Sequence, residues 1–279
     1  MRIRFGAALG LSLVVFFLAL PSSFGWGENA ERLIANKAVD TLPSEMQSFF
    51  QANRQFLVQH VTDPDYAEAK NAADQHNGFI QLDHYGPFPF AALPRSYNAA
   101  VAKYTRRTVW NYGLLPWQIG LYSQRLTDEM RAHNWDEAKL TAALLAHYVA
   151  AAHDPFNTTV NDEGKLSGQP GVNERFSVGL VGRFQLFFFL RPNEAAFIPD
   201  PTDHAFEMSL NAHSWLENVL LADRRAHTGL TTYSDEYYDR FYAQAGAVLV
   251  RQLSDASADL GSFWMTAWIN AGRPQLPQQ

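Results

Sequence analysis

The sequence predicts an all-α fold. Apolar residues recur every three or four positions through most of the chain, and the period-two alternation that marks a half-buried strand is lacking. Of the 279 residues, 47% are hydrophobic and 18% charged, so the chain is long enough to bury a large core and is not polar enough to be disordered. No linker or internal repeat divides it. We therefore expect a single multi-helix domain over residues 26–279.

The expected elements follow one another with short breaks. The first helix covers residues 28–40, and the segment Leu-Pro-Ser at 42–44 ends it and caps the next helix, residues 45–61. A turn at 60–66 and an irregular connection at 77–94, rich in Gly, Pro and aromatic residues, come next. The later helices are expected at 97–110, 116–133, 136–153, 173–189, 203–226, 234–254 and 256–270.

The first residues have the three regions of a secretory signal. A basic start at 1–4 precedes an apolar run at 5–20 and a segment of small residues that ends at Gly25. We expect cleavage before Trp26 and export to the periplasm or the exterior. An uncleaved anchor is the alternative, but the apolar run is short for a membrane span.

Charge and cysteine usage exclude several classes of function. The formal net charge is −6, and removal of residues 1–25 takes away two arginines and no acid, which moves it to −8. Such a chain does not attract polyanions from a distance, so binding of nucleic acid is not expected. The absence of cysteine excludes disulfides, thiolate metal ligands and a cysteine nucleophile.

The most informative stretch is residues 144–177. An Ala-rich helical run carries His147, breaks at Asp154-Pro155, and continues through a Gly-rich polar loop into a second helix near Val172. This framework resembles the metal-binding core of the zinc-dependent phospholipase C and S1/P1 nuclease superfamily, which reads HYxxDxxxPxH and then GxHxxxxE. The resemblance implies an all-α domain of the phospholipase C/P1 nuclease type and an ancestor that cleaved phosphodiesters with three zinc ions.

Other motifs extend the resemblance in the right order. The segment WGENAERLIANKAVDTLPSEM, from Trp26, is similar to WGxxxHxxIxxxAxxxLPxxM, with Glu31 where the superfamily has His. In the superfamily, the amine and carbonyl of that Trp bind metal once the signal is removed. The DPD turn offers Asp63 as the bridging acid, with Asp65 as the open alternative. GFIQLDHYG resembles HFIDLDHYG, and the ending WMTAWINAG is similar to the bacterial phospholipase C-like branch.

The superfamily's ligand positions are only partly kept. Trp26, Asp63 and His147 are retained, and Glu31 is a changed group that still binds metals. The remaining positions hold groups that are poor ligands or none for zinc: Gly78, Ala151, Asn157, Asn173 and Ser177. Loss of so many ligands predicts loss of the trinuclear centre, because even an outer-shell change costs about 10 to 100-fold in metal affinity or activity.

Two hypotheses from different classes follow. The first is a non-catalytic exported protein without a cofactor, which keeps the fold and serves in structure or in binding a lipid or phosphate ester in its cleft. The second is a phosphodiester or phospholipid hydrolase with one rebuilt metal site, held by Trp26, Glu31, Asp63 and His147. Its metal is zinc or a hard divalent cation, because asparagine carbonyls such as those of the replaced positions suit calcium better than zinc.

Several other residues have simpler interpretations. His153 is expected to end its helix, and His204, His213 and His227 are expected to be solvated, because their spacing does not place them on one face. The run at 187–190, Phe-Phe-Phe-Leu, is apolar on every side and is expected in the core. A loop that contacts a membrane is the alternative for this run.

Overall fold

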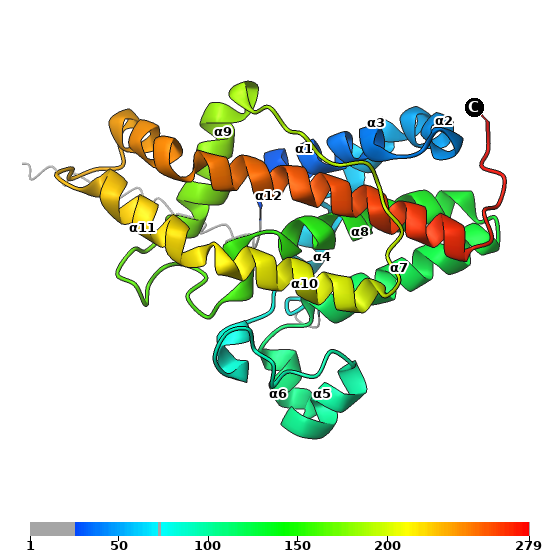
Figure 1. Ribbon diagram of the computed structural model, residues 1–279, viewed down its shortest axis with the longest axis horizontal. Coiled ribbons are helices and arrows are strands. Elements are labelled where there is room, and N and C mark those ends of the chain that lie inside the picture. The colour runs from blue at the N-terminus through cyan, green and yellow to red at the C-terminus, as the bar shows by residue number, and fades with distance from the viewer. Residues whose placement is uncertain (1–25, 72–73, 279) are drawn as a thin grey trace, which may run out of the picture.

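The computed structural model describes residues 26–71 and 74–278, and every regular element in those ranges is a helix (Figure 1), which confirms the all-α prediction. The expected signal at 1–25 lies outside the described residues. None of the helices described is both long and apolar enough to cross a membrane. The α-helices are α1 Glu28–Ala38, α2 Ser44–Ala52, α3 Arg54–His60, α4 Asp63–Lys70, α5 Tyr97–Tyr104, α6 Arg106–Asn111, α7 Leu115–Arg131, α8 Trp135–Ala152, α9 Val181–Phe184, α10 Pro201–Ser214, α11 Leu216–His227 and α12 Asp235–Asn270; the short helical turns are η1 Val39–Thr41, η2 Leu82–Tyr85, η3 Pro155–Thr158, η4 Glu174–Leu180 (a π-helix) and η5 Gln185–Phe187.

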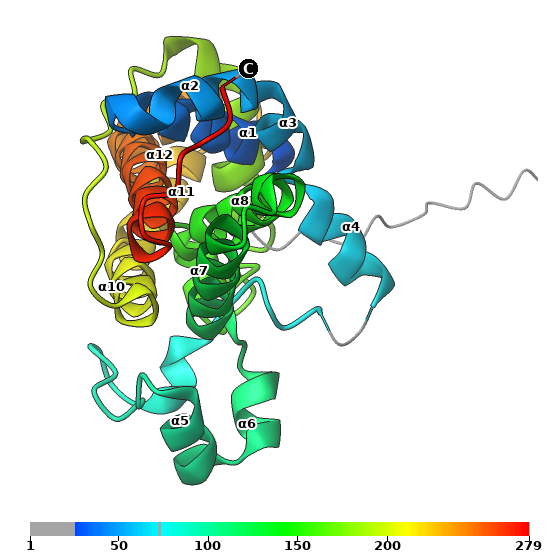
Figure 2. The same ribbon diagram turned by 90° about the vertical axis from the view of Figure 1, so that its right-hand side faces the viewer.

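Helices α8 and α12 form the centre of the bundle. Helix α12 spans 36 residues and packs against α1, α7, α8 and α11, and α8 also contacts α1, α3 and α7. Helix α8 is buried on all sides from Leu145 onward, and seven of the twelve buried residues of the whole helix are alanines, so neighbouring helices approach its backbone closely. Helices α5 and α6 pack on each other below the main bundle (Figure 2).

Helix boundaries differ from the prediction where local chemistry is decisive. The helix expected at 45–61 is two helices, because the amide of Asn53 bonds the Phe49 carbonyl at 2.8 Å and ends α2. The helix expected at 97–110 breaks at Thr105, whose φ is 72° and whose hydroxyl caps α6. The single helix expected at 203–226 is wrong, because it is broken at Trp215 into α10 and α11. The two helices expected at 234–254 and 256–270 are also wrong. They are one helix, α12, since no Gly or Pro interrupts residues 254–257.

Other segments also differ from the prediction. The turn expected at 60–66 is instead the end of α3 and the start of α4, since a proline at the first turn and acids near the N-terminus favour a helix start at Asp63. The helix expected at 173–189 is present as consecutive helical pieces of different type, the π-helix η4, the α-helix α9 and the turn η5, and it ends at Phe187. The run at 187–190 is not core as expected: Phe187 and Phe189 are exposed, whereas Phe188 packs on Tyr242.

Close contact between α12 and η1 requires a glycine at position 261. A Cβ placed on Gly261 would overlap the hydroxyl of Thr41, which donates to the Ala38 carbonyl at 2.7 Å. We expect Gly261→Ala to lower the free energy of unfolding by about 1–3 kcal/mol, because overpacking forces this joint apart. Chemical denaturation measures the change.

The control for this prediction is Gly182→Ala in α9, where an added Cβ meets no atom within 4 Å. This variant should keep the stability of the parent or gain up to about 1 kcal/mol, because alanine is the better helix former. Equal destabilisation by both substitutions would contradict the packing argument.

Candidate metal centre

Three helices bring one acid or imidazole each to a common point. Glu31 of α1, Asp65 of α4 and His147 of α8 each offer one ligand atom, and these atoms lie within 4.8 Å of one another. Nδ1 of His147 is 3.2 Å from Oε1 of Glu31. Glu31 reaches this point because it lies on the buried face of α1 with Ile34 and Ala38.

Several polar atoms around this cluster are buried without a hydrogen-bond partner. They are both carboxylate oxygens of Glu31, both ring nitrogens of His147, Oδ1 of Asn157 and Nε1 of Trp26. The contact between Glu31 and His147 is at ion-pair distance, but it lacks the geometry of a hydrogen bond. An unpaired buried polar group costs about 1–3 kcal/mol. A divalent cation bound by Glu31, Asp65 and His147 would satisfy the carboxylate and the imidazole, so these residues fit one cation.

The structure separates the two acids of the DPD turn. Asp63, the first candidate from the sequence, is not in the cluster: its Oδ2 lies 2.7 Å from Nδ1 of His60. Residues two positions apart on a helix face different sides, so Asp65, the alternative, turns toward His147. The set that meets is therefore Glu31, Asp65 and His147.

Glu68 is a further member of this region that sequence reasoning missed. It follows Asp65 by three positions and lies on the same side of α4. A Cβ on Gly78, where the superfamily has a histidine, would lie 3.3 Å from Oε2 of Glu68. The other oxygen of Glu68 is buried without a hydrogen-bond partner. The sequence contained a signal for Glu68: it is spaced three residues from Asp65, and the glycine at position 78 leaves space for its side chain. His76 lies two positions before Gly78 and packs on Trp110, with 3.6 Å between the ring centroids.

Burial changes the protonation of every member of the cluster. It raises the pKa of Glu31 and that of Glu68 to about 7, and it also raises the pKa of Asp65. Burial alone would lower the pKa of His147, but the Glu31, Asp65 and Glu68 carboxylates outweigh it and raise that pKa to about 9. Near neutral pH the cluster thus retains protons that a divalent cation would displace.

Residues at which the resemblance implies further ligands form hydrogen bonds within the protein. The amide of Asn157 donates to the Ala151 carbonyl at 3.1 Å. The Ser177 hydroxyl lies 2.7 Å from Oδ2 of Asp154 and 2.9 Å from Oδ1 of Asn173. Burial raises the pKa of Asp154 to about 6, against the bonds from Ser177 and a backbone amide, which lower it. Ser177, Asp154 and Asn173 thus form one hydrogen-bonded group, whereas Oδ1 of Asn157 has no partner.

Trp26 packs as an aromatic plug. Its ring is buried and lies 5.7 Å from that of Phe176, measured between centroids, and the chain passes next to Val178 at Gly27. This packing concerns the side chain alone. The metal-binding role expected for the main-chain amine of Trp26 requires cleavage before Trp26.

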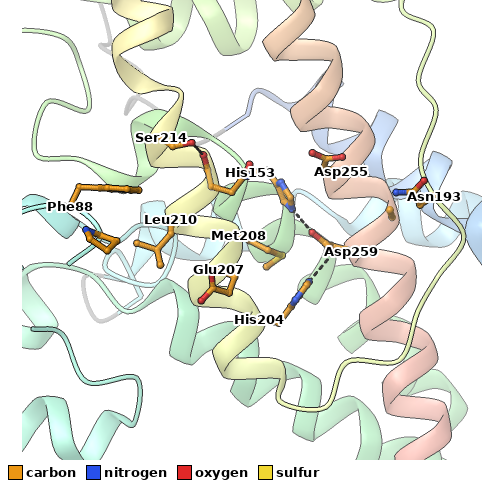
Figure 3. A pocket seen from close by; sticks show the side chains of 13 residues that line it. Phe88, His153, Asn193, His204, Glu207, Met208, Leu210, Ser214, Asp255 and Asp259 are labelled. Carbon is orange, nitrogen blue, oxygen red and sulfur yellow. Dashed lines mark hydrogen bonds and ion pairs between the residues drawn. The ribbon is translucent and has the colours of Figure 1, made fainter. Parts of the chain in front are cut away.

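A second polar group lies in an open pocket of about 560 Å³ between α10 and α12 (Figure 3). The carboxylate of Asp259 accepts from Nε2 of His153 at 3.0 Å and from Nε2 of His204 at 2.8 Å. Burial would raise the pKa of Asp259, but the two histidines hold it well below its usual range. His204, expected to be solvated, is therefore bonded. Because the carboxylate stands between the rings, this group ties the end of α8 to α10 and α12.

The cluster makes a direct prediction about cation binding. Manganese or zinc added to chelator-treated protein should raise the melting temperature by several degrees, because a cation about 100-fold above its Kd stabilises by about 2.7 kcal/mol. Asp65→Asn should abolish the shift, since it removes one ligand. Asp63→Asn is the matched control and should keep the shift; loss of the shift in both variants would rule out the arrangement.

The protonation of the cluster predicts an opposite pH dependence with and without cation. Glu31 and His147 have folded pKa values of about 7 and 9, above their ordinary 4.5 and 6.5. Their contribution to stability is therefore present at low pH and lost as pH rises through those folded values. In EDTA, melting temperature should fall between about pH 5 and about pH 9, whereas the cation-induced shift should grow.

Glu31→Gln provides the control for this pH profile, because its side chain does not titrate. Thermal melts across the same pH range should then show a shallower fall in EDTA. A profile in EDTA that rises with pH in the parent protein would contradict the assignment.

A search of protein-family models and a search of curated proteins both find no match to this chain.

Proposed function

We propose that this chain is a non-catalytic helical protein of the phospholipase C/P1 nuclease type that holds one divalent cation between α1, α4 and α8. The observation that carries the proposal is the buried pair Glu31 and His147, whose polar atoms make no hydrogen bond, with Asp65 beside it. The order of the sequence motifs supports the type of domain. The cation replaces the trinuclear zinc centre that the resemblance implies, and its role is to join three helices.

The burial of the ligands supports a structural cation. A catalytic metal keeps an open position for water or substrate, whereas a structural site is closed by protein groups. Glu31 is 1% exposed and His147 is 0% exposed. In addition, the bonds from Ser177 to Asp154 and from Asn157 to Ala151 occupy the positions that further metals would need.

The ligand chemistry favours a harder cation than the zinc of the superfamily. The cluster offers the carboxylates of Glu31, Asp65 and Glu68, a single imidazole and no thiolate. Carboxylate oxygens suit manganese and calcium, while one imidazole also suits zinc. Elemental analysis of protein purified without chelator identifies the cation and its stoichiometry.

The proposal includes the place where the protein acts. The basic start, the apolar run at 5–20 and the small residues before Trp26 support export to the periplasm or the exterior. A lipid or phosphate ester is the class of ligand that the resemblance supports for a binding role. The negative net charge speaks against nucleic acid.

A single-metal phosphoester hydrolase is the second candidate function. It is favoured by the partial exposure of Asp65 and Glu68, which leaves one side of the cluster accessible. A cation bound there would supply an acidified water and neutralise charge on a phosphoryl oxygen. Glu68, with a pKa raised to about 7 by burial, would serve as the general base at neutral pH.

An activity assay distinguishes the two candidates. With manganese, zinc or calcium supplied, the protein should not hydrolyse a chromogenic phosphodiester or phosphatidylcholine above the buffer rate, because the site is closed and lacks most superfamily ligands. Elemental analysis of the same sample confirms that the cation is bound. Metal-dependent turnover that disappears in both His147→Ala and Glu68→Gln would instead establish the hydrolase.

A further inference from the structure

Three large apolar side chains stand exposed where α9 and η5 end. Leu186 is 92% exposed, Phe187 76% and Phe189 69%. We call these three residues the apolar knob. The segment that carries them projects beyond α1 and α12 at the edge of the bundle (Figure 1). Exposed apolar groups that cluster in this way mark an interaction site more often than scattered ones do.

The knob is held in place by two neighbouring aromatic residues, Phe184 and Phe188. Phe184 stacks on Tyr242 with centroids 4.2 Å apart and planes 9° apart, and Phe188 lies over the same ring at 6.2 Å and 16°. The Phe188 amide donates to the Gln185 carbonyl at 3.2 Å. The aromatic rings at 184 and 188 thus point inward and direct the knob outward.

Basic residues flank the knob. Arg183 and Arg191 are the charged residues nearest the knob in the sequence, and the nearest acids, Glu174 and Glu194, lie outside residues 175–193. The guanidinium of Arg191 lies 4.5 Å from the ring centroid of Phe189, and that of Arg183 lies 3.8 Å from that of Tyr238. Asp235 is 3.7 Å from Arg183 and largely exposed, so this ion pair is weak. Arginines beside apolar anchors are typical of segments that bind anionic lipid surfaces.

An open pocket of about 650 Å³ lies next to Gly182 and Arg183, a few residues before the knob. A Cβ on Gly182 would meet no atom within 4 Å. The lining carries three charged side chains: Glu174, Arg175, which is paired with Asp223 at 2.8 Å, and Arg183. Arg183 is therefore the positive group that a lipid phosphate would contact, in a space large enough for a lipid head group.

We propose that the apolar knob inserts into the interfacial layer of an anionic phospholipid bilayer, where Arg183 and Arg191 contact lipid phosphates. A second copy of the chain is a poorer occupant, because a two-fold contact through the knob would bring the same arginines of both copies together. The proposal depends on neither the metal centre nor the proposed function, and chelation should leave lipid binding unchanged.

Vesicle flotation tests the proposal with phosphatidylcholine vesicles that contain phosphatidylglycerol. The double substitution Leu186→Ser and Phe187→Ser should lower the partition coefficient by at least about tenfold, because it removes two apolar anchors. Leu166→Ser is the matched control: Leu166 is 72% exposed but lies in the polar loop after η3, so this variant should bind like the parent.

A second pair of substitutions tests the electrostatic part. Arg183→Gln with Arg191→Gln should weaken binding to the anionic vesicles and leave the weaker binding to pure phosphatidylcholine unchanged. All variants are compared in the chain that begins at Trp26 and in the full chain, so that parent and variant share the same N-terminal residues.

Three results would overturn the proposal. The first is no binding by the parent chain, and the second is equal binding by the parent and the serine variant at the knob. The third is a dimer in sedimentation equilibrium that the same serine variant dissociates, which would assign the knob to contact between copies. Unchanged melting temperatures show that each variant is folded.

Discussion

The enclosed pair of Glu31 and His147 is the constraint on which the rest of the structure depends. The two side chains come from α1 and α8 and meet without a hydrogen bond between them. Removing two charged groups from water costs several kcal/mol per ion even when they lie at ion-pair distance, so the helices that carry the pair must be held by strong packing elsewhere. The Ala-rich second half of α8 provides it, because small side chains let α1, α7 and α12 approach closely. The polar centre and the apolar core around it are parts of one arrangement.

Much of the fold followed from helical periodicity, and the failures have local causes. Periodicity located α1, α7 and α8 to within a few residues, since their apolar faces are long and regular. It did not locate the break at Asn53, which depends on a side-chain bond to a carbonyl, nor the continuity of α12 through Asp255. A periodic pattern does not record whether a single polar residue interrupts a helix, because tertiary packing decides that.

The candidate site could also be predicted only in part, because tertiary packing decides which side chains meet. The motifs placed Glu31 and His147 on helices and left Asp63 and Asp65 as alternatives, and only the direction of α4 separates the two acids. Glu68 was missed because its relation to the site runs through the space left by Gly78, a contact between segments that a linear pattern does not contain. The expectation of a buried Phe187 failed because composition alone does not distinguish inward from outward residues in an irregular turn.

The pairing of α1 with α12 has a consequence for how the chain folds. Helix α12, about 54 Å long if regular, begins more than two hundred positions after α1, yet the two are direct neighbours. Contacts between distant parts of a sequence require closure of long loops before they become favourable, and they slow folding. The first helix therefore lacks one of its packing partners until α12 has been synthesised. Until then, α1 is limited to nearer partners in the sequence, such as α3 and α8.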